Sequence, residues 1–284
     1  MTGTAVYLYG VARDLDPAAL GGTPGVSGAA VRGVVAGGLT ALVSTVRLDD
    51  YGEAALRANL EDLAWLEETA RAHHEVVDRA AHAAPTAPVR IATLYRDDAR
   101  VAEILADQRE RFGEVLDGIA GRSEWGVKVY ASPPEPAEPA GSDPGGGLEP
   151  RAEPLTGSRP PKPGAGAGTA YLRRRQDERR RREDAGRRMA ERASALHAEL
   201  AEHAIASRHH PPQDPRLSGR AGTQIMNAAY LLDDEREAGF LAAARAAAGH
   251  LEGVELEVTG PWPPYSFIDA DTVSAAPAAG DPAS

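Results

Sequence analysis

Three potential metal ligands recur at four-residue steps in the sequence: His74, Asp78 and His82. Side chains four residues apart share one face of a helix, so two neighbours could chelate one ion. The third would lie about 12 Å along the helix axis from the first, which is too far to join the same ion. Neither a cysteine nor an HExxH motif accompanies them. We therefore predict a polar helix face here and no metal site.

Motifs for nucleotide binding and nucleophilic catalysis are missing from the sequence. No GxxxxGK[ST] phosphate loop occurs, and the glycine-rich stretch 21–25 does not lead directly into a predicted helix. No GxSxG nucleophile elbow occurs, and the absence of cysteine excludes thiolate nucleophiles, disulfides and Cys-based metal sites. We predict that the protein is not an enzyme and uses no cofactor. A hydrolase with an unrecognised site is the weakest alternative, because it rests only on abundant Asp, Glu and His.

The highest local charge lies in Arg173–Arg188, where nine arginines and four acidic residues give a net charge of +5. A basic helix of this kind could hold phosphates, which makes a nucleic-acid-binding module the alternative function. Acidic residues at three- and four-residue steps instead favour ion pairs within the helix, such as Asp177 with Arg181. The segment also lacks interleaved aromatic residues to stack on bases. We favour a solvated or partner-facing helix, with Arg174 and Arg181 as candidate contacts.

The whole-chain composition is that of an acidic protein with a hydrophobic core. The chain has 284 residues, a net charge of −11 and 42% hydrophobic residues. This length allows one large domain or two modest ones, and the acidic balance argues against nucleic-acid binding by the chain as a whole. The first residues do not resemble a secretory signal, and no apolar run reaches about 18 residues. We expect a soluble, cytoplasmic protein.

Proline and glycine divide the chain into two folded segments. Residues 131–168 contain ten prolines and eight glycines, a composition that predicts a disordered linker. The tail 269–284 has the same character. The predicted domains are therefore residues 1–130 and residues 169–268.

The first segment alternates between strand and helix patterns. Strands are predicted at 4–9, 31–36, 39–46, 89–95 and 124–130, with a hairpin at Gly37-Gly38, and helices at 53–83 and 97–120. In the first helix, three- and four-residue steps from Leu56 to Val77, including Leu60, Leu63 and Leu66, predict one buried apolar stripe. We predict an α+β domain with helices on one face of a mostly antiparallel sheet, close to a modified ferredoxin-like fold.

The second segment predicts a smaller α+β domain with a long helix. That helix spans about 169–207, and a strand at 223–232, a helix at 233–249 and a strand at 253–259 follow it. The end of the segment, 260–267, contains three prolines with aromatic residues between them. We expect it to run extended along a sheet edge.

Several blocks of the sequence resemble the gas vesicle protein GvpF/GvpL family. The final block is the most specific, and the order of the blocks adds to the match. They are Tyr7–Gly10, Leu60–Leu66, Ala72–His74, Glu124–Tyr130, Gly168–Leu172, Asn227–Leu232 and Thr259–Phe267.

The resemblance implies a cytoplasmic, non-enzymatic accessory protein for gas vesicle assembly. It would bind the hydrophobic shell protein or other accessory proteins as a chaperone-like or nucleation factor, or remain as a minor vesicle component. Trp262, Tyr265 and Phe267 are candidate partner contacts, because partly exposed aromatics often anchor interfaces. The alternative, which we favour, is that these rings pack the C-terminal segment onto its own domain. The sequence does not separate an F-like from an L-like role.

Overall fold

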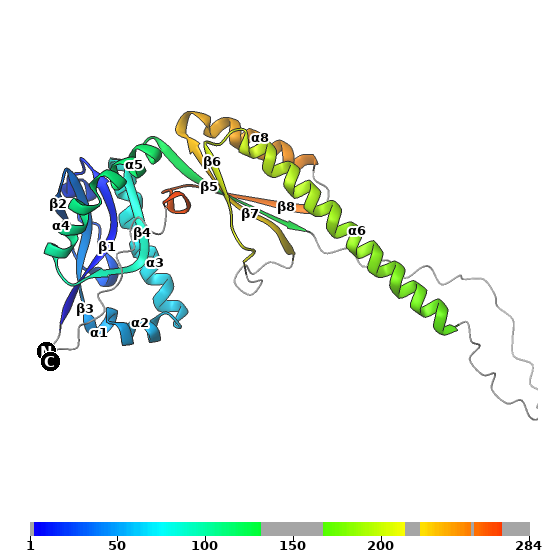
Figure 1. Cartoon of the computed structure of the whole chain (residues 1–284), viewed down its shortest axis with the longest axis horizontal. Coiled ribbons are helices and arrows are strands. Elements are labelled where there is room, and N and C mark those ends of the chain that lie inside the picture. Colours follow the sequence, from blue (N-terminus) through cyan, green and yellow to red (C-terminus); the bar gives the residue numbers. More distant parts are fainter. Residues whose placement is uncertain (1–2, 132–166, 214–221, 251–252, 269–284) are drawn as a thin grey trace, which may run out of the picture.

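The structure is a computed structural model that describes residues 3–131, 167–213, 222–250 and 253–268. It is a mixed α/β fold built on two four-stranded antiparallel sheets (Figure 1). The strand orders are β2-β3-β1-β4 and β6-β7-β5-β8. The strands are β1 Thr4–Arg13, β2 Val31–Ala36, β3 Leu39–Arg47, β4 Thr86–Tyr95, β5 Arg122–Ala131, β6 Ala206–His209, β7 Thr223–Asp233 and β8 Val254–Trp262.

The helices are more numerous and shorter than the sequence pattern predicts. They are α1 Leu48–Tyr51, α2 Glu53–Asn59, α3 Leu63–Ala83, α4 Asp98–Asp107, α5 Arg109–Ile119, α6 Ala167–Ala201 and α8 Glu237–His250. The single helix predicted at 53–83 is wrong at residues 60–62. There the side chain of Asp62 accepts hydrogen bonds from the backbone N–H groups of Ala64 and Trp65, and so caps a new helix. Likewise, the helix predicted at 97–120 divides at Gln108.

The first sheet is covered by helices on both faces. Val6 and Leu8 of β1 pack with residues of α4 and α5, whereas Tyr7 and Tyr9 face α3. The prediction of helices on one face is therefore wrong. Side chains alternate between the two faces along β1, and both faces carry large apolar or aromatic groups, so both need a cover.

The predicted hairpin at Gly37-Gly38 is confirmed. Ala36 pairs with Leu39, and both glycines have positive φ angles of 59° and 79°. This is the backbone that a two-residue turn between antiparallel strands requires.

The second sheet takes one of its two central strands, β5, from the N-terminal half of the chain. β5 lies between β7 and β8, and α8 and the C-terminal half of α6 cover one face of this sheet (Figure 1). The domain boundaries 1–130 and 169–268 stay a prediction, but the sheets divide the chain earlier, before Arg122. The predicted linker and tail lie outside the described residues, apart from the few next to β5 and α6.

The C-terminal segment crosses from the second sheet to the first. Pro261 and Trp262 extend β8, and a 3₁₀ turn, η4 Tyr265–Phe267, then contacts β4. Tyr265 and Ile268 join hydrophobic clusters on opposite faces of the first sheet. The segment therefore passes around β4, the edge strand, and shields it from further pairing. The favoured expectation, that these aromatics pack on their own domain, is wrong for Tyr265.

The crossing depends on a glycine. Gly260 has a φ of +140°, and a Cβ there would lie 2.9 Å from both the carbonyl oxygen of Glu124 and the ring of Trp125. We predict that Gly260→Ala lowers the free energy of unfolding by about 1–3 kcal/mol, because both backbone strain and the contact oppose it. Urea denaturation followed by circular dichroism measures this. Gly118→Ala is the control, since nothing lies within 4 Å of its added methyl group; an equal loss in both variants would contradict the prediction.

Candidate functional site

The C-terminal segment 260–268, here called the clasp, is held by a half-buried carboxylate of β5. Glu124 accepts a hydrogen bond from the backbone N–H of Ser266 at 2.7 Å and another from its hydroxyl at 2.6 Å. The hydroxyl also lies 3.1 Å from Nε2 of His210. Burial raises the pKa of Glu124, while the bonds from Ser266 and the charges of His210 and Arg208 act in the opposite direction.

This Glu–Ser–His group differs in order from a nucleophilic triad. In a Ser-His-Asp triad the imidazole lies between the carboxylate and the hydroxyl, so that it can accept the hydroxyl proton. Here the hydroxyl of Ser266 lies between Glu124 and His210, and it donates its hydrogen bond directly to the carboxylate. The arrangement is suited to fixing Ser266 in place.

Next to the clasp, an aromatic cluster fills the space between β1 and α3. The Tyr7 ring lies 4.9 Å from that of Tyr9 and 5.7 Å from those of Tyr51 and His73, and Tyr265 of the clasp lies 6.3 Å from His73. The Tyr7 hydroxyl accepts a hydrogen bond from the N–H of Ala92 and lies 3.0 Å from Nδ1 of His73. The clasp therefore completes a cluster whose other members all come from the first 73 residues.

His73 is buried as a neutral base. Burial lowers its pKa to about 4; the carbonyl of Val89 raises the pKa to a lesser extent, and His74 lowers it. Donation by the Tyr7 hydroxyl to Nδ1 would place the imidazole proton on Nε2. Among the described residues, the buried hydroxyl of Tyr265 has no hydrogen-bond partner. Since such a group costs free energy, the surrounding packing must hold it in place.

The three predicted aromatic contacts have different environments. The side chain of Trp262 is 43% exposed, and its ring lies 5.3 Å from that of His74 on α3. The guanidinium carbon of Arg208 lies over the ring of Phe267, 5.8 Å from the centre of that ring. The buried hydroxyl of Tyr265 points into the protein's interior. Trp262 is therefore the most accessible of the three.

An apolar strip on α3 leads to Trp262, and sequence reasoning missed it. Leu63, Leu66, Ala70 and His74 follow at helical spacing and are exposed or half-buried. Leu63 is 69% exposed, so the prediction that it faces the core is wrong. The buried face of α3 is formed by Thr69, His73, Val76, Val77 and Ala80, so the predicted stripe is correct for His73 and Val77. We call Leu63, Leu66, Ala70, His74 and Trp262 the apolar strip.

The arginine-rich half of α6 extends beyond the second sheet, with no described element beside it (Figure 1). Arg181 is exposed, whereas the side chain of Arg174 lies outside the described part of the structure. Ion pairs join Arg179 to Glu183 at 2.9 Å and Asp184 to Arg187 at 2.7 Å. Intrahelical pairing is therefore present, but through other residues than the predicted pair Asp177 and Arg181.

Of the predicted polar face of α3, Asp78 and His82 lie together, with Nδ1 of His82 2.8 Å from the backbone oxygen of Asp78. His74 departs from that prediction, because its ring lies beside Trp262 in the apolar strip. Across the described ranges, no three His, Cys, Asp or Glu residues are grouped as a metal site would need.

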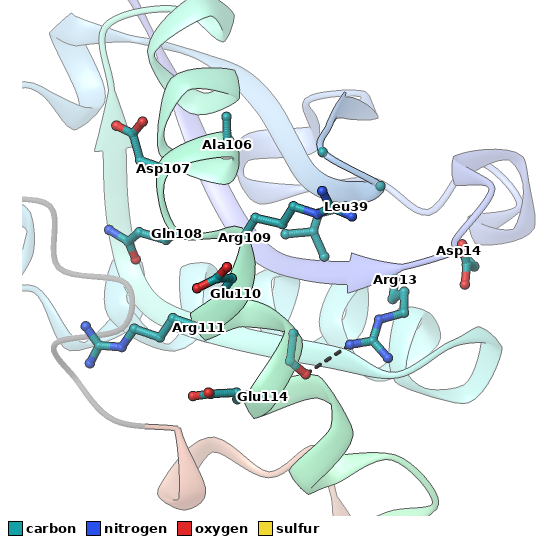
Figure 2. Close-up of a pocket in the computed structure, with 13 residues that line it drawn as sticks. Arg13, Asp14, Leu39, Ala106, Asp107, Gln108, Arg109, Glu110, Arg111 and Glu114 are labelled. Carbon is teal, nitrogen blue, oxygen red and sulfur yellow. Dashed lines mark hydrogen bonds between the residues drawn. The ribbon is translucent and has the colours of Figure 1, made fainter.

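A separate groove lies where the β2–β3 turn meets the α4–α5 junction (Figure 2). Its Arg13 is engaged with Asp117 and with the carbonyl of Gly113. The labelled carboxylates there do not converge on one point (Figure 2).

None of the described helices is both long enough and apolar enough to cross a membrane.

The fold and site define a two-sheet α/β protein whose C-terminal clasp closes its first domain. The model of the gas vesicle synthesis protein GvpL/GvpF family matches residues 5–269. The chain is 40% identical over 261 residues to gas vesicle protein L of Streptomyces sp. (strain CB03234), covering 92% of this chain and 91% of that one. It is 28% identical over 279 residues to gas vesicle protein F of the same strain, covering 93% of this chain and 100% of that one.

A solved structure has the same fold. The crystal structure of the gas vesicle protein GvpF from Anabaena sp. PCC7120 matches with a TM-score of 0.63 at 18% identity, over 93% of this chain and 96% of that one. The chain therefore belongs to the GvpL/GvpF family of gas vesicle synthesis proteins.

The burial of His73 predicts a pH-dependent stability. Because its folded-state pKa is about 4 and its ordinary value is 6.5, the unfolded chain binds the proton more tightly. The free energy of unfolding should fall by about 3 kcal/mol from this group as the pH drops from 6.5 to 4. The raised pKa of Glu124 acts in the opposite direction, since protonating this carboxyl relieves its burial cost.

Urea denaturation at several pH values between 7 and 4.5 measures this effect. His73→Gln removes the titrating group, so the variant should be less stable at pH 7 but lose less stability on acidification. An equal acid-induced loss in the variant and the unmodified protein would show that His73 is not the source.

Proposed function

We propose that this protein is a non-enzymatic accessory factor of gas vesicle assembly that binds the hydrophobic shell protein through the apolar strip. Membership of the GvpL/GvpF family supports a role in gas vesicle synthesis. The observation that carries the binding proposal is the line of exposed and half-buried apolar groups from Leu63 to Trp262.

The physical argument is that apolar surface must be covered during assembly. A subunit that exposes such surface before it joins a shell aggregates unless another protein contacts it. Leu63 and Trp262 offer an aliphatic and an aromatic anchor, while Glu67 and Glu75, both exposed, lie on the same helix as part of a polar surround. An amphipathic helix of the shell protein is the kind of segment that such a strip accepts.

The family comparison favours an L-type role. The chain shares 40% identity with the L protein and 28% with the F protein of the same Streptomyces strain.

We also propose the modified ferredoxin-like description for the first sheet. The order β4-β1-β3-β2 and the antiparallel pairing of its neighbours support it, with a loop containing short 3₁₀ turns in place of the helix after β1.

Binding to the shell protein can be tested with a matched pair of variants. Leu63 on the strip and Val35 on the edge strand β2 are both 69% exposed. We predict that Leu63→Glu weakens association with purified shell protein about tenfold, because it places a charge in an apolar contact, whereas Val35→Glu does not. Trp262→Ala should act like Leu63→Glu.

Co-purification and light scattering of the shell protein are the measurements, and circular dichroism checks that each variant is folded. Equal binding by the Leu63 and Val35 variants would exclude the strip as the contact. If the unmodified protein neither bound the shell protein nor suppressed its aggregation, the proposed function itself would be wrong.

A further inference from the structure

The exposed face of α6 carries a regular pattern of alternating charge. Charges of opposite sign follow one another at alternating steps of four and three residues along one line of the helix. They are Arg173, Asp177, Arg180, Asp184, Arg187 and Glu191. Steps of four and three keep residues on one face of a helix, as in the contact line of a coiled coil. We call these six residues the charge seam.

The seam faces away from the rest of the protein. α6 packs against the second sheet through Ala193, Leu196 and Leu200, all buried. At 3.6 residues per turn, the seam lies on the opposite side of the helix from these three residues. Its members are exposed, except for the half-buried Asp184. This half of α6 extends beyond the sheet, and no described element lies beside it, which leaves room for a second helix (Figure 1).

The order of charges in the seam is complementary to itself in the antiparallel direction. When two copies of α6 are aligned antiparallel about residue 182, Arg173 faces Glu191 of the other copy. In the same alignment Asp177 faces Arg187, and Arg180 faces Asp184. Two-fold symmetry repeats each contact, so every seam residue meets one of opposite charge. Shifting the helices by one residue along the axis removes this match.

We propose that the charge seam is a self-association surface through which two copies of this protein pair their α6 helices antiparallel. The proposal is independent of the shell-protein contact, which lies on α3. The pairing leaves the two bodies at opposite ends of the helix pair, and the seam spans about 27 Å at 1.5 Å per residue. The intrahelical pair of Asp184 and Arg187 is compatible with it, because a guanidinium has five donors and can hold two carboxylates.

A nucleic acid is a poorer fit to the same face. Half of the seam positions are acidic and would repel phosphates, and no aromatic residue occurs between Leu172 and Arg192 to stack on a base. The contact between copies is all charged, so it should be salt-sensitive. We expect a reversible dimer at about 50 mM salt that dissociates at about 500 mM.

Charge exchange in the full-length chain tests the pairing. Arg180→Glu with Arg187→Glu makes four of the six facing pairs like-charged and should raise the dimer dissociation constant about tenfold or more. Asp177→Arg with Asp184→Arg should do the same. Mixing the two double variants restores opposite charges at every facing pair, so a heterodimer should form. The control Arg175→Glu with Arg179→Glu makes the same change in net charge away from the seam and should leave the dimer intact.

Sedimentation velocity at both salt concentrations measures association, and circular dichroism checks that α6 stays helical. A monomeric unmodified protein at low salt would overturn the proposal, as would failure of the mixed variants to associate. Equal loss in the control would mean that net charge, and not the seam, drives association. A gel shift with DNA or RNA that the seam variants abolish, in place of dimerisation, would assign the face to nucleic acid.

Discussion

The structure depends on one half-buried carboxylate. Glu124 lies on β5, the strand that carries the chain out of the first domain, and its two oxygens accept hydrogen bonds from the backbone N–H and the hydroxyl of Ser266. Partial burial of a carboxylate costs free energy, and the two hydrogen bonds from Ser266 offset that cost. Their bond ties the middle of the chain to its C-terminal segment, which in turn closes the first domain.

The clasp has two consequences for the first domain. It carries Tyr265 into the aromatic cluster around His73, and it places Ile268 in the apolar cluster on the other face of the sheet. The first domain therefore needs residues that lie far along the chain from its own strands. The buried hydroxyl of Tyr265, which has no hydrogen-bond partner among the described residues, lies at this closure and costs free energy that the gain in packing must offset.

The same closure organises the surface that we assign to the shell protein. The clasp sets Trp262 beside His74, which makes the exposed side of α3 continuous with the C-terminal segment. The charge seam lies elsewhere, on the free half of α6. In the role that we propose, two separate surfaces would let one bind the shell protein while the other pairs copies of this protein.

The sequence by itself determined the family, most of the strands, the Gly37-Gly38 hairpin and the alternation of side chains along β1, because these follow from local spacing and turn chemistry. It did not determine that Asp62 ends one helix and begins another, since apolar periodicity continues across that break. It also could not show that Leu63 is exposed while His73 is buried, because both fall on a plausible helical stripe. Only the tertiary structure decided that β5 joins the second sheet and that the clasp returns to the first. Those choices rest on contacts between residues more than a hundred positions apart, such as Glu124 with Ser266, which no local pattern encodes.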